Sequence, residues 1–304
     1  PGVPEIEAEL KCKLEKVMWL PCFYAIPPDI QIAGSKAYKS GKIYGMDAAS
    51  GAAVVALDVS PGDHVLDLCA APGAKLCMLS DILGSSGSLT GVDVARDRLA
   101  ACRTMLQKYA LGDRCRLFVS DGTRFSLLPL RFAEWTSKRL WKDRKNASKA
   151  RPELMFYGSH SGVVGLCRKE VGYDKVLVDA ECTHDGSIKH IRKFEYWGWT
   201  TLQHRVLDAE RTENLSHLQL GLLTNGFRLL KVGGSLVYST CSLTVTQNED
   251  VVEQFLSQNP SAELQEVDAA ANWCCRSGRI PRTLRFDPST SQTSGLFVAK
   301  ITKL

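Results

Sequence analysis

Short apolar runs alternate with amphipathic segments along most of the chain after residue 60. Six apolar runs predict buried strands, at 63–68, 87–93, 114–121, 174–180, 234–240 and 295–301. Apolar residues at helical spacing predict helices between them, at 73–83, 95–110, 201–234 (one long helix or two shorter ones, ending in glycines) and 248–259. Strands that alternate with helices are typical of a parallel sheet covered on both faces. The pattern therefore predicts an α/β fold with a doubly wound, mainly parallel sheet.

The first 55 residues follow a different pattern. Three prolines between 19 and 32 argue against a continuous helix there. A segment of small residues, 44–57, predicts a helix that leads into the main part of the chain. We therefore expect a small N-terminal extension over 1–55, which packs on a catalytic domain over 56–304.

The interval 122–173 does not fit the alternation, and we expect an insertion without regular structure there. Between 131 and 151 it has eight Lys or Arg residues against two acidic ones. The stretch is either a solvated charged loop or a surface that faces phosphates, since Lys and Arg supply most of the affinity for nucleic acids.

Composition narrows the class of protein without naming a function. A hydrophobic content of 44% and a net charge of +5 are ordinary for a globular protein with a slight preference for anionic partners. Without a run of 18 apolar residues, no membrane span is expected. The eleven cysteines are odd in number and include no CxxC pair. They predict free thiols in a reduced, intracellular protein.

Aspartates stand at the ends of four predicted strands, at Asp67, Asp93, Asp121 and Asp179. In a doubly wound sheet these ends meet at one edge, where ligands bind. The first turn, within "VLDLCAAPGAK" (65–75), lacks GxGxxG, which disfavours a dinucleotide. A ligand with ribose hydroxyls, an adenine amino group and a positive sulfonium would use all four carboxylates. That ligand is S-adenosylmethionine, and the second strand's aspartate suits its ribose hydroxyls.

Six motifs stand in the order seen in one enzyme family. They are "DLCAAPGAK" (67–75), "GVDVARDRL" (91–99), "SDGT" (120–123), "VLVDAECT" (176–183), "STCSL" (239–243) and "RFDPSTSQTSGLFVAK" (285–300). Together they resemble the Sun/Nop (NSun) family of RNA cytosine-5 methyltransferases over about residues 40–304. The resemblance implies a class I methyltransferase (Rossmann-like) fold, S-adenosylmethionine as the methyl donor, and a cytosine of RNA as the acceptor.

The resemblance also implies which residues hold the methyl donor. They lie in the loop after the first strand, on the following helices and at the ends of the next strands: Cys69, Ala70, Ala71, Pro72, Gly73, Ala74, Lys75, Asp93, Arg98, Asp121, Gly122 and Asp179.

Methylation of cytosine at carbon 5 calls for a thiol nucleophile and an acid, because carbon 5 alone is a poor nucleophile. A thiolate that adds to carbon 6 turns the ring into an enamine, whose carbon 5 then attacks the methyl group. An acid at the edge of the base stabilises the charge that builds on the ring. The resemblance assigns the nucleophile to Cys241, product release to Cys182, the acid to Asp179, and a contact with base or phosphate to Lys75.

Two positions depart from the family pattern. Glu181 stands directly before Cys182, where the family usually has proline. His184 stands directly after the pair Cys182-Thr183, where the family usually has a small residue or glycine. Loss of the proline predicts a less rigid loop, and a second acid near Cys182 predicts a raised thiol pKa. We interpret His184 as a loop residue and not as a catalytic base.

These departures leave a second interpretation open: a catalytically impaired RNA-binding or assembly factor that retains the fold. A methyltransferase for proteins or small molecules is disfavoured, because transfer to oxygen or nitrogen needs no thiol.

The expected partner is RNA, with the target cytosine unpaired or flipped out of its stack. Transfer RNA is favoured over ribosomal RNA. We expect no metal, no membrane association and a monomeric state. The nucleus or the cytoplasm is the favoured compartment, with the mitochondrion as an alternative.

Overall fold

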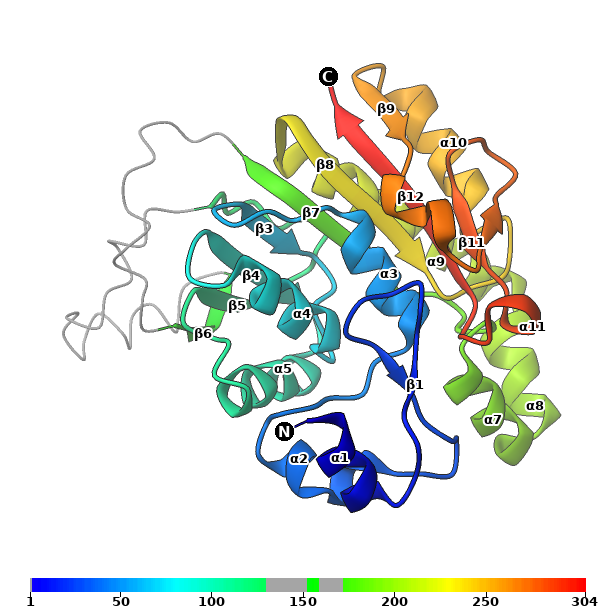
Figure 1. The fold of residues 1–304 in the computed structure, drawn as a ribbon. Helices are drawn as coiled ribbons and strands as arrows, with labels where there is room; N and C mark the ends of the chain where they lie inside the picture. The colour runs from blue at the N-terminus through cyan, green and yellow to red at the C-terminus, as the bar shows by residue number, and fades with distance from the viewer. Residues whose placement is uncertain (1, 130–151, 159–171) are drawn as a thin grey trace.

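The structure of the chain, a computed structural model, describes residues 2–129, 152–158 and 172–304 (Figure 1). The basic stretch 131–151 lies outside the described residues, so both interpretations of it stay open.

Within the described residues, a ten-stranded sheet has parallel strands in the middle and antiparallel strands on both sides. The parallel strands follow the order β8 (Leu230–Thr240), β7 (Tyr173–Asp179), β3 (His64–Asp67), β4 (Ser88–Asp93) and β5 (Cys115–Val119). The antiparallel strands are β12 (Leu296–Lys303), β9 (Ala262–Gln265), β11 (Leu284–Phe286) and β10 (Arg276–Ser277) beyond β8, and β6 (Glu153–Tyr157) beyond β5. The predicted α/β fold with a mainly parallel sheet is confirmed.

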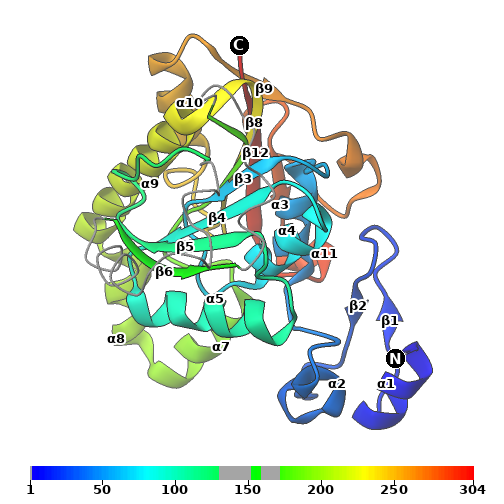
Figure 2. The same cartoon turned by 90° about the vertical axis from the view of Figure 1, so that its left-hand side faces the viewer.

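Helices cover both faces of this sheet, because successive residues of a buried strand point to opposite sides. Val65 of β3 belongs to one core layer, and its neighbour Leu66 belongs to the other. The first layer includes buried residues of α3 (Ala48–Ala56), α4 (Ala74–Leu83) and α5 (Arg96–Lys108). The second includes those of α9 (Ala209–Leu229) and α10 (Glu249–Gln258). Figure 2 shows α9 and α10 on one side of the sheet and α3 and α4 on the other.

Three parts of the chain differ from the prediction. Strand β6 lies within the interval 122–173, where no regular structure is predicted, and pairs with β5. Helix α9 ends at Leu229, so that Gly233 and Gly234 belong to strand β8 and not to the helix end. Before α9 the chain forms α7 (Ile188–Trp197), α8 (Trp199–Leu202) and the π-helical turn η3 (Gln203–Leu207), and α7 is not predicted.

The N-terminal segment forms small elements that contact the rest of the molecule. They are α1 (Val3–Leu10), the hairpin of β1 (Glu15–Lys16) and β2 (Tyr24–Ala25), η1 (Ile32–Gly34) and α2 (Lys36–Lys39). The ring of Trp19 lies 6.2 Å from that of Trp273 and 5.6 Å from that of Phe286. Helix α3 continues through residue 55 to Ala56 with its buried residues in the main core. The division into 1–55 and 56–304 stays a prediction.

Two short elements complete the chain, η4 (Asp268–Asn272) and α11 (Pro288–Ser291). Among the described residues, no helix has both the length and the apolar character needed to cross a membrane.

A buried ion pair holds the segment that follows β8. Glu249, in the first turn of α10, is 1% exposed, and Arg285 of β11 donates to both of its carboxylate oxygens. The same guanidinium donates to the carbonyl oxygens of Leu243 (2.9 Å) and Thr244 (3.4 Å). It therefore fixes the loop after Cys241 to the antiparallel side of the sheet.

Replacing Arg285 with Met should destabilise the fold by about 3–5 kcal/mol, because Glu249 would remain buried without its partner. The free energy of unfolding in urea measures this loss, and the additional change Glu249→Gln should restore part of it. Arg279→Met serves as the matched control, because Arg279 pairs with Asp250 and Glu253 at the exposed surface and should matter little. Equal losses of unfolding free energy in Arg285→Met and Arg279→Met would contradict a stabilising role of the buried ion pair.

Candidate active site

Two thiols meet where β7 and β8 end. The parallel register places Asp179 beside Ser239, and three residues after Asp179 and two after Ser239 come Cys182 and Cys241. Their Sγ atoms lie 3.4 Å apart. Cys182 is 1% exposed, whereas Cys241 is partly exposed. The two sulfurs therefore lie in contact, and Cys241 is the one that a substrate can reach.

Gly186 brings the loop after β7 against the loop after β8. Its backbone N–H donates to the carbonyl oxygen of Cys241 at 2.9 Å. A Cβ atom at this position would lie 2.6 Å from that oxygen, closer than any side chain tolerates. Glycine is therefore required for the approach that joins the two thiols.

Two glutamines fix the loop that has Glu181 in place of proline. Gln219 of α9 donates to the carbonyl oxygen of Glu181 at 2.8 Å and to the Gln247 side-chain oxygen at 3.1 Å. That oxygen also accepts from the backbone N–H of Thr183, and the Gln247 amide donates back to the Thr183 hydroxyl. Both glutamines are fully buried. Contrary to the expectation of a less rigid loop, this buried network constrains the backbone on both sides of Cys182.

His184 contacts both sulfurs. Its Nδ1 lies 3.0 Å from Cys241 Sγ and 3.6 Å from Cys182 Sγ. The residue has a left-handed backbone with φ 58°, and its ring stacks on that of His190 from α7, with centroids 4.4 Å apart. His184 lies in the loop after β7, as predicted, and its imidazole is within hydrogen-bonding distance of both thiols. That it is not a catalytic base stays a prediction.

The contacts shift the pKa values of all three groups. The hydrogen bond from Cys241, opposed by burial and aided by His184, lowers the pKa of Cys182 to about 6. The same contact and burial raise the pKa of Cys241, and the hydrogen bond with Cys182 raises the pKa of His184. The thiol pair therefore holds one negative charge near pH 7, and the raised pKa of His184 favours the charged imidazole beside it. The predicted rise in the pKa of Cys182 is wrong, because these hydrogen bonds outweigh the effect of burial.

The same three donor atoms lie within 4.8 Å of one another, as ligands of one metal ion would. Two thiolates of a tetrahedral zinc site would lie about 3.8 Å apart, from Zn–S bonds of about 2.3 Å. The separations of 3.0–3.6 Å found here suit hydrogen bonds better. The expectation that the protein needs no metal stays a prediction. The ten cysteines of the described residues are all free, as predicted.

Asp179 and Lys75 form an ion pair beside the thiols. Lys75 lies in the first turn of α4, and its Nζ is 2.6 Å from Asp179 Oδ2. The Ser239 hydroxyl donates to the other carboxylate oxygen at 2.8 Å. Burial opposes the charge on Lys75, but Asp179 more than compensates and raises the pKa of Lys75. The structure therefore brings together the four residues predicted as catalytic, which are Lys75, Asp179, Cys182 and Cys241.

The loop after β3, with its predicted donor-binding residues 69–74, is held by β4 and α5. Asp93, 7% exposed, accepts from the backbone N–H of Ala71 (3.1 Å) and of Ala95 (2.9 Å), one to each oxygen. Arg98 donates to the Ala71 carbonyl oxygen at 3.2 Å. A carboxylate oxygen has two acceptor positions, so Asp93 retains one on each oxygen for ribose hydroxyls. These acceptor positions suit the ribose hydroxyls of the predicted ligand.

The other two strand-end aspartates differ in their surroundings. Asp67 is 1% exposed and accepts from the N–H of Cys69, and burial raises its pKa to about 7. Asp121 is exposed and accepts from the backbone and hydroxyl of Thr123. Gly122 lies against Leu68 and Leu222, where a Cβ would collide. Contacts of Asp121 and Gly122 with the methyl donor stay predictions.

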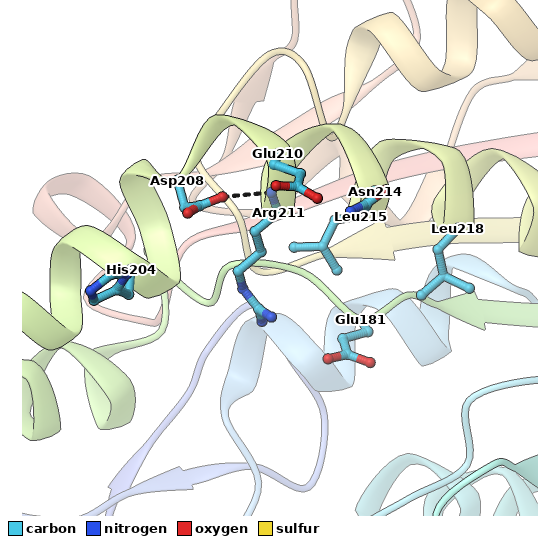
Figure 3. Close-up of a pocket in the computed structure, with 8 residues that line it drawn as sticks. All are labelled: Glu181, His204, Asp208, Glu210, Arg211, Asn214, Leu215 and Leu218. Carbon is cyan, nitrogen blue, oxygen red and sulfur yellow. Dashed lines mark hydrogen bonds between the residues drawn. The ribbon is translucent and has the colours of Figure 1, made fainter.

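A cleft of about 490 Å³ opens beside Glu181, and no motif predicts it. Its walls come from η3, the first half of α9 and the loop after β7: Glu181, His204, Asp208, Glu210, Arg211, Asn214, Leu215 and Leu218. Figure 3 shows Arg211 extending from α9 toward the segment that contains Glu181. The residue adjacent to Cys182 therefore faces an open, charged cleft.

Comparison with known proteins identifies the family. Residues 54–133 and 164–302 match the family described as 16S rRNA methyltransferase RsmB/F. The chain belongs to the RsmB/F methyltransferase family.

Relatives within this group support the same conclusion. A tRNA (cytosine(49)-C(5))-methyltransferase of Pyrococcus abyssi is 28% identical, over 99% of this chain and 85% of that protein. The 5-cytosine rRNA methyltransferase NSUN4 of Bos taurus is 32% identical, over 74% of this chain and 48% of that protein. A mitochondrial tRNA (cytosine(34)-C(5))-methyltransferase of Danio rerio is also 32% identical, over 82% and 56%. The chain thus spans most of the archaeal relative but about half of the two vertebrate ones.

A solved structure agrees with these relatives. A methyltransferase homologue from Pyrococcus horikoshii has a TM-score of 0.69 at 26% identity, over 100% of this chain and 83% of that one. The predicted resemblance and the class I methyltransferase fold are confirmed, as is S-adenosylmethionine as the methyl donor.

In this RsmB/F member, His184→Asn should raise the pKa of the thiol pair from about 6 toward about 8.5, the value of an ordinary thiol. Asparagine tolerates the left-handed backbone but cannot become a cation. The rate at which iodoacetamide alkylates Cys241, the accessible sulfur, is followed against pH by peptide mass spectrometry, and the pH at which this rate is half its maximum measures the pKa. His217→Asn on the exposed side of α9 is the control and should leave it unchanged. An unchanged pKa in His184→Asn would show that His184 does not lower the pKa of the thiols.

Asp93→Ala should weaken binding of S-adenosylmethionine roughly tenfold to a hundredfold, because charge-assisted hydrogen bonds of about 1.5–3 kcal/mol would be lost. Titration calorimetry measures the dissociation constant. Asp97→Ala, exposed on the neighbouring helix, is the matched control and should bind normally. Unchanged affinity in a folded Asp93 variant would exclude the ribose contact.

Proposed function

We propose that the protein is an RNA cytosine-5 methyltransferase that acts through a covalent bond between Cys241 and the target base. The observation that carries this proposal is the contact of two thiols, 3.4 Å apart, beside the ion pair of Lys75 and Asp179. Methyl transfer to oxygen or nitrogen has no use for such a pair, whereas cytosine carbon 5 needs a thiolate to activate it.

The two thiols differ in exposure and in charge, and these differences give them different roles. Cys182 holds the negative charge at rest but is 1% exposed, and Cys241 is the accessible sulfur. The proton of Cys241 can pass to Cys182 over their 3.4 Å contact. Cys241 then attacks carbon 6 as a thiolate, while His184, 3.0 Å away, stabilises its charge.

Asp179 and Lys75 hold the edge of the base. The Asp179 carboxylate can accept from the exocyclic amine of cytosine, and the Lys75 ammonium, 2.6 Å from it, keeps the carboxylate oriented. The methyl donor supplies an electrophilic methyl group to carbon 5. The proton on carbon 5 then passes to water, and its bonding electrons restore the C5–C6 double bond. The electron pair of the C6–S bond returns to Cys241, and Cys182 assists this release by giving back its proton over the 3.4 Å contact. Asp93 and the loop at 69–74 orient the donor.

The alternative of an impaired assembly factor rested on the loop at 181–184. Its backbone is held by Gln219 and Gln247, and the pKa of Cys182 is lowered. Both observations favour the active enzyme.

The substrate class follows from the relatives. We propose transfer RNA before ribosomal RNA, because the archaeal relative that spans 99% of this chain is named for a position in transfer RNA. The monomeric state and the compartment, nucleus or cytoplasm before mitochondrion, stay as predicted from the sequence.

Substitution of each cysteine should give a different product on a denaturing gel. With labelled transfer RNA and S-adenosylmethionine, Cys241→Ala should show neither methylation nor adduct, because no thiolate attacks carbon 6. Cys182→Ala should accumulate protein covalently joined to RNA, because His184, 3.0 Å from Cys241, can still take the proton before attack, whereas release is slowed. The wild type should show methylation with little adduct.

Cys115→Ala, a buried cysteine of β5 away from the pair, serves as the matched control. Adduct that persists without Cys241 and vanishes without Cys182 would reverse the two roles. A wild type that methylates neither transfer RNA nor ribosomal RNA would defeat the proposed function.

A further inference from the structure

Helices α7 and α8 with η3 expose aromatic rings directly after the catalytic loop. Tyr196 is 89% exposed, Trp199 68% and Trp197 41%. Of the described side chains in this segment, only Phe194 is buried. In Figure 1 the two helices project beside α9, away from the sheet. We call the exposed surface of residues 188–207 the α7–α8 face.

This face is joined to the active site. It begins two residues after Gly186, whose N–H donates to the Cys241 carbonyl oxygen. On α7, His190 stacks on His184, which contacts both catalytic sulfurs. A molecule held on the α7–α8 face would therefore lie next to the base that Cys241 attacks.

The charge of the face is strongly positive. Four cations stand in the segment against one acid, Glu195: Lys189, Arg192, Lys193 and Arg205. Two of them lie over one ring, with Lys193 Nζ 5.5 Å and the Arg205 guanidinium 5.0 Å from the centroid of Trp197. In the described part of the chain, none of the four forms an ion pair with a carboxylate. They are available to an anionic partner.

We infer that the α7–α8 face binds single-stranded RNA next to the target cytosine, by stacking bases on Tyr196 and Trp199 and by holding phosphates with the surrounding cations. This inference rests on the proposed function. Flat rings interleaved with Lys and Arg match the two chemical features of an unpaired strand, base faces and phosphates. An apolar protein partner would use the rings but would leave four cations unpaired, which disfavours it.

The aromatic pair provides the first test. Tyr196→Ala and Trp199→Ala should each weaken binding of a fluorescent single-stranded RNA that contains cytosine by about tenfold, within the range seen for a lost stacking contact. Trp199→Phe, which keeps a flat ring, should retain most of the affinity, and Trp199→Leu, which keeps only apolar bulk, should lose it. Val232→Ala is the control, because Val232 is 69% exposed near the start of β8, at the opposite end of the strand from Cys241.

The cations provide the second test. Lys189→Gln combined with Arg192→Gln should reduce the slope of log affinity against log salt by about 1.4, since each of two lost phosphate contacts in single-stranded RNA contributes about 0.7. Binding of S-adenosylmethionine should remain at the wild-type level in all variants, which also shows that they are folded.

The outcomes separate this inference from the proposed function. If the wild type methylates RNA but the Tyr196 and Trp199 variants bind RNA as tightly as it does, the docking surface is wrong and the function stands. If those variants lose binding while the wild type transfers no methyl group, the surface stands and the function is wrong. Equal affinity losses in Trp199→Phe and Trp199→Leu would overturn the stacking contact.

Discussion

The parallel pairing of β7 with β8 is the constraint on which the site depends. It places the ends of two strands that are sixty residues apart in sequence side by side, with Asp179 opposite Ser239. Beyond these residues the two segments turn at the same edge of the sheet, and the N–H of Gly186 donates to the carbonyl oxygen of Cys241. A slip of two residues in this register would move one sulfur by about 7 Å, since a strand rises about 3.3 Å per residue. The hydrogen bond between the thiols, and with it the lowered pKa of Cys182, would be lost.

Several buried hydrogen bonds fix the loops that follow these two strands. Gln219 and Gln247 tie the segment at 181–183 to the segment before α10, and Arg285 ties the segment after Cys241 to β11. Each loop thus has a partner on a regular element that does not itself carry catalytic groups. Rigidity that one proline provides through its ring is here provided by side-chain amides from a neighbouring helix and loop.

Much of the central fold could be predicted from the sequence, because buried parallel strands are nearly continuous apolar runs. The short strands β9, β10 and β11 lie toward one side of the sheet and have no such run. Strand β6 has a short apolar run, but it lies inside an interval that does not follow the alternation of strands and helices. Gly233 and Gly234 predict a helix end, but the pairing of β8 with its neighbours includes them in a strand. Tertiary contacts determine the secondary structure at these positions, so the local sequence pattern could not predict it.

The same limit applies to the site. Lys75, Asp179, Cys182 and Cys241 were accessible to prediction because they stand at fixed places in motifs. His184 was not, because its contact with Cys241 depends on a left-handed backbone and on a loop of β8 that is 57 residues away. The shift of Cys182 to a lower pKa, against the effect expected from Glu181, likewise follows from distances that no local pattern contains.

The closeness of the two sulfurs also makes the protein sensitive to oxidants. Sulfur atoms 3.4 Å apart need to approach by only about 1.4 Å to form a disulfide of about 2.05 Å. Cys182, with its lowered thiol pKa, reacts readily in oxidation and in thiol–disulfide exchange. One oxidation would consume both thiols together, and one reduction would return both. Where such a disulfide forms, Cys241 has no thiolate with which to attack a base until both thiols are reduced.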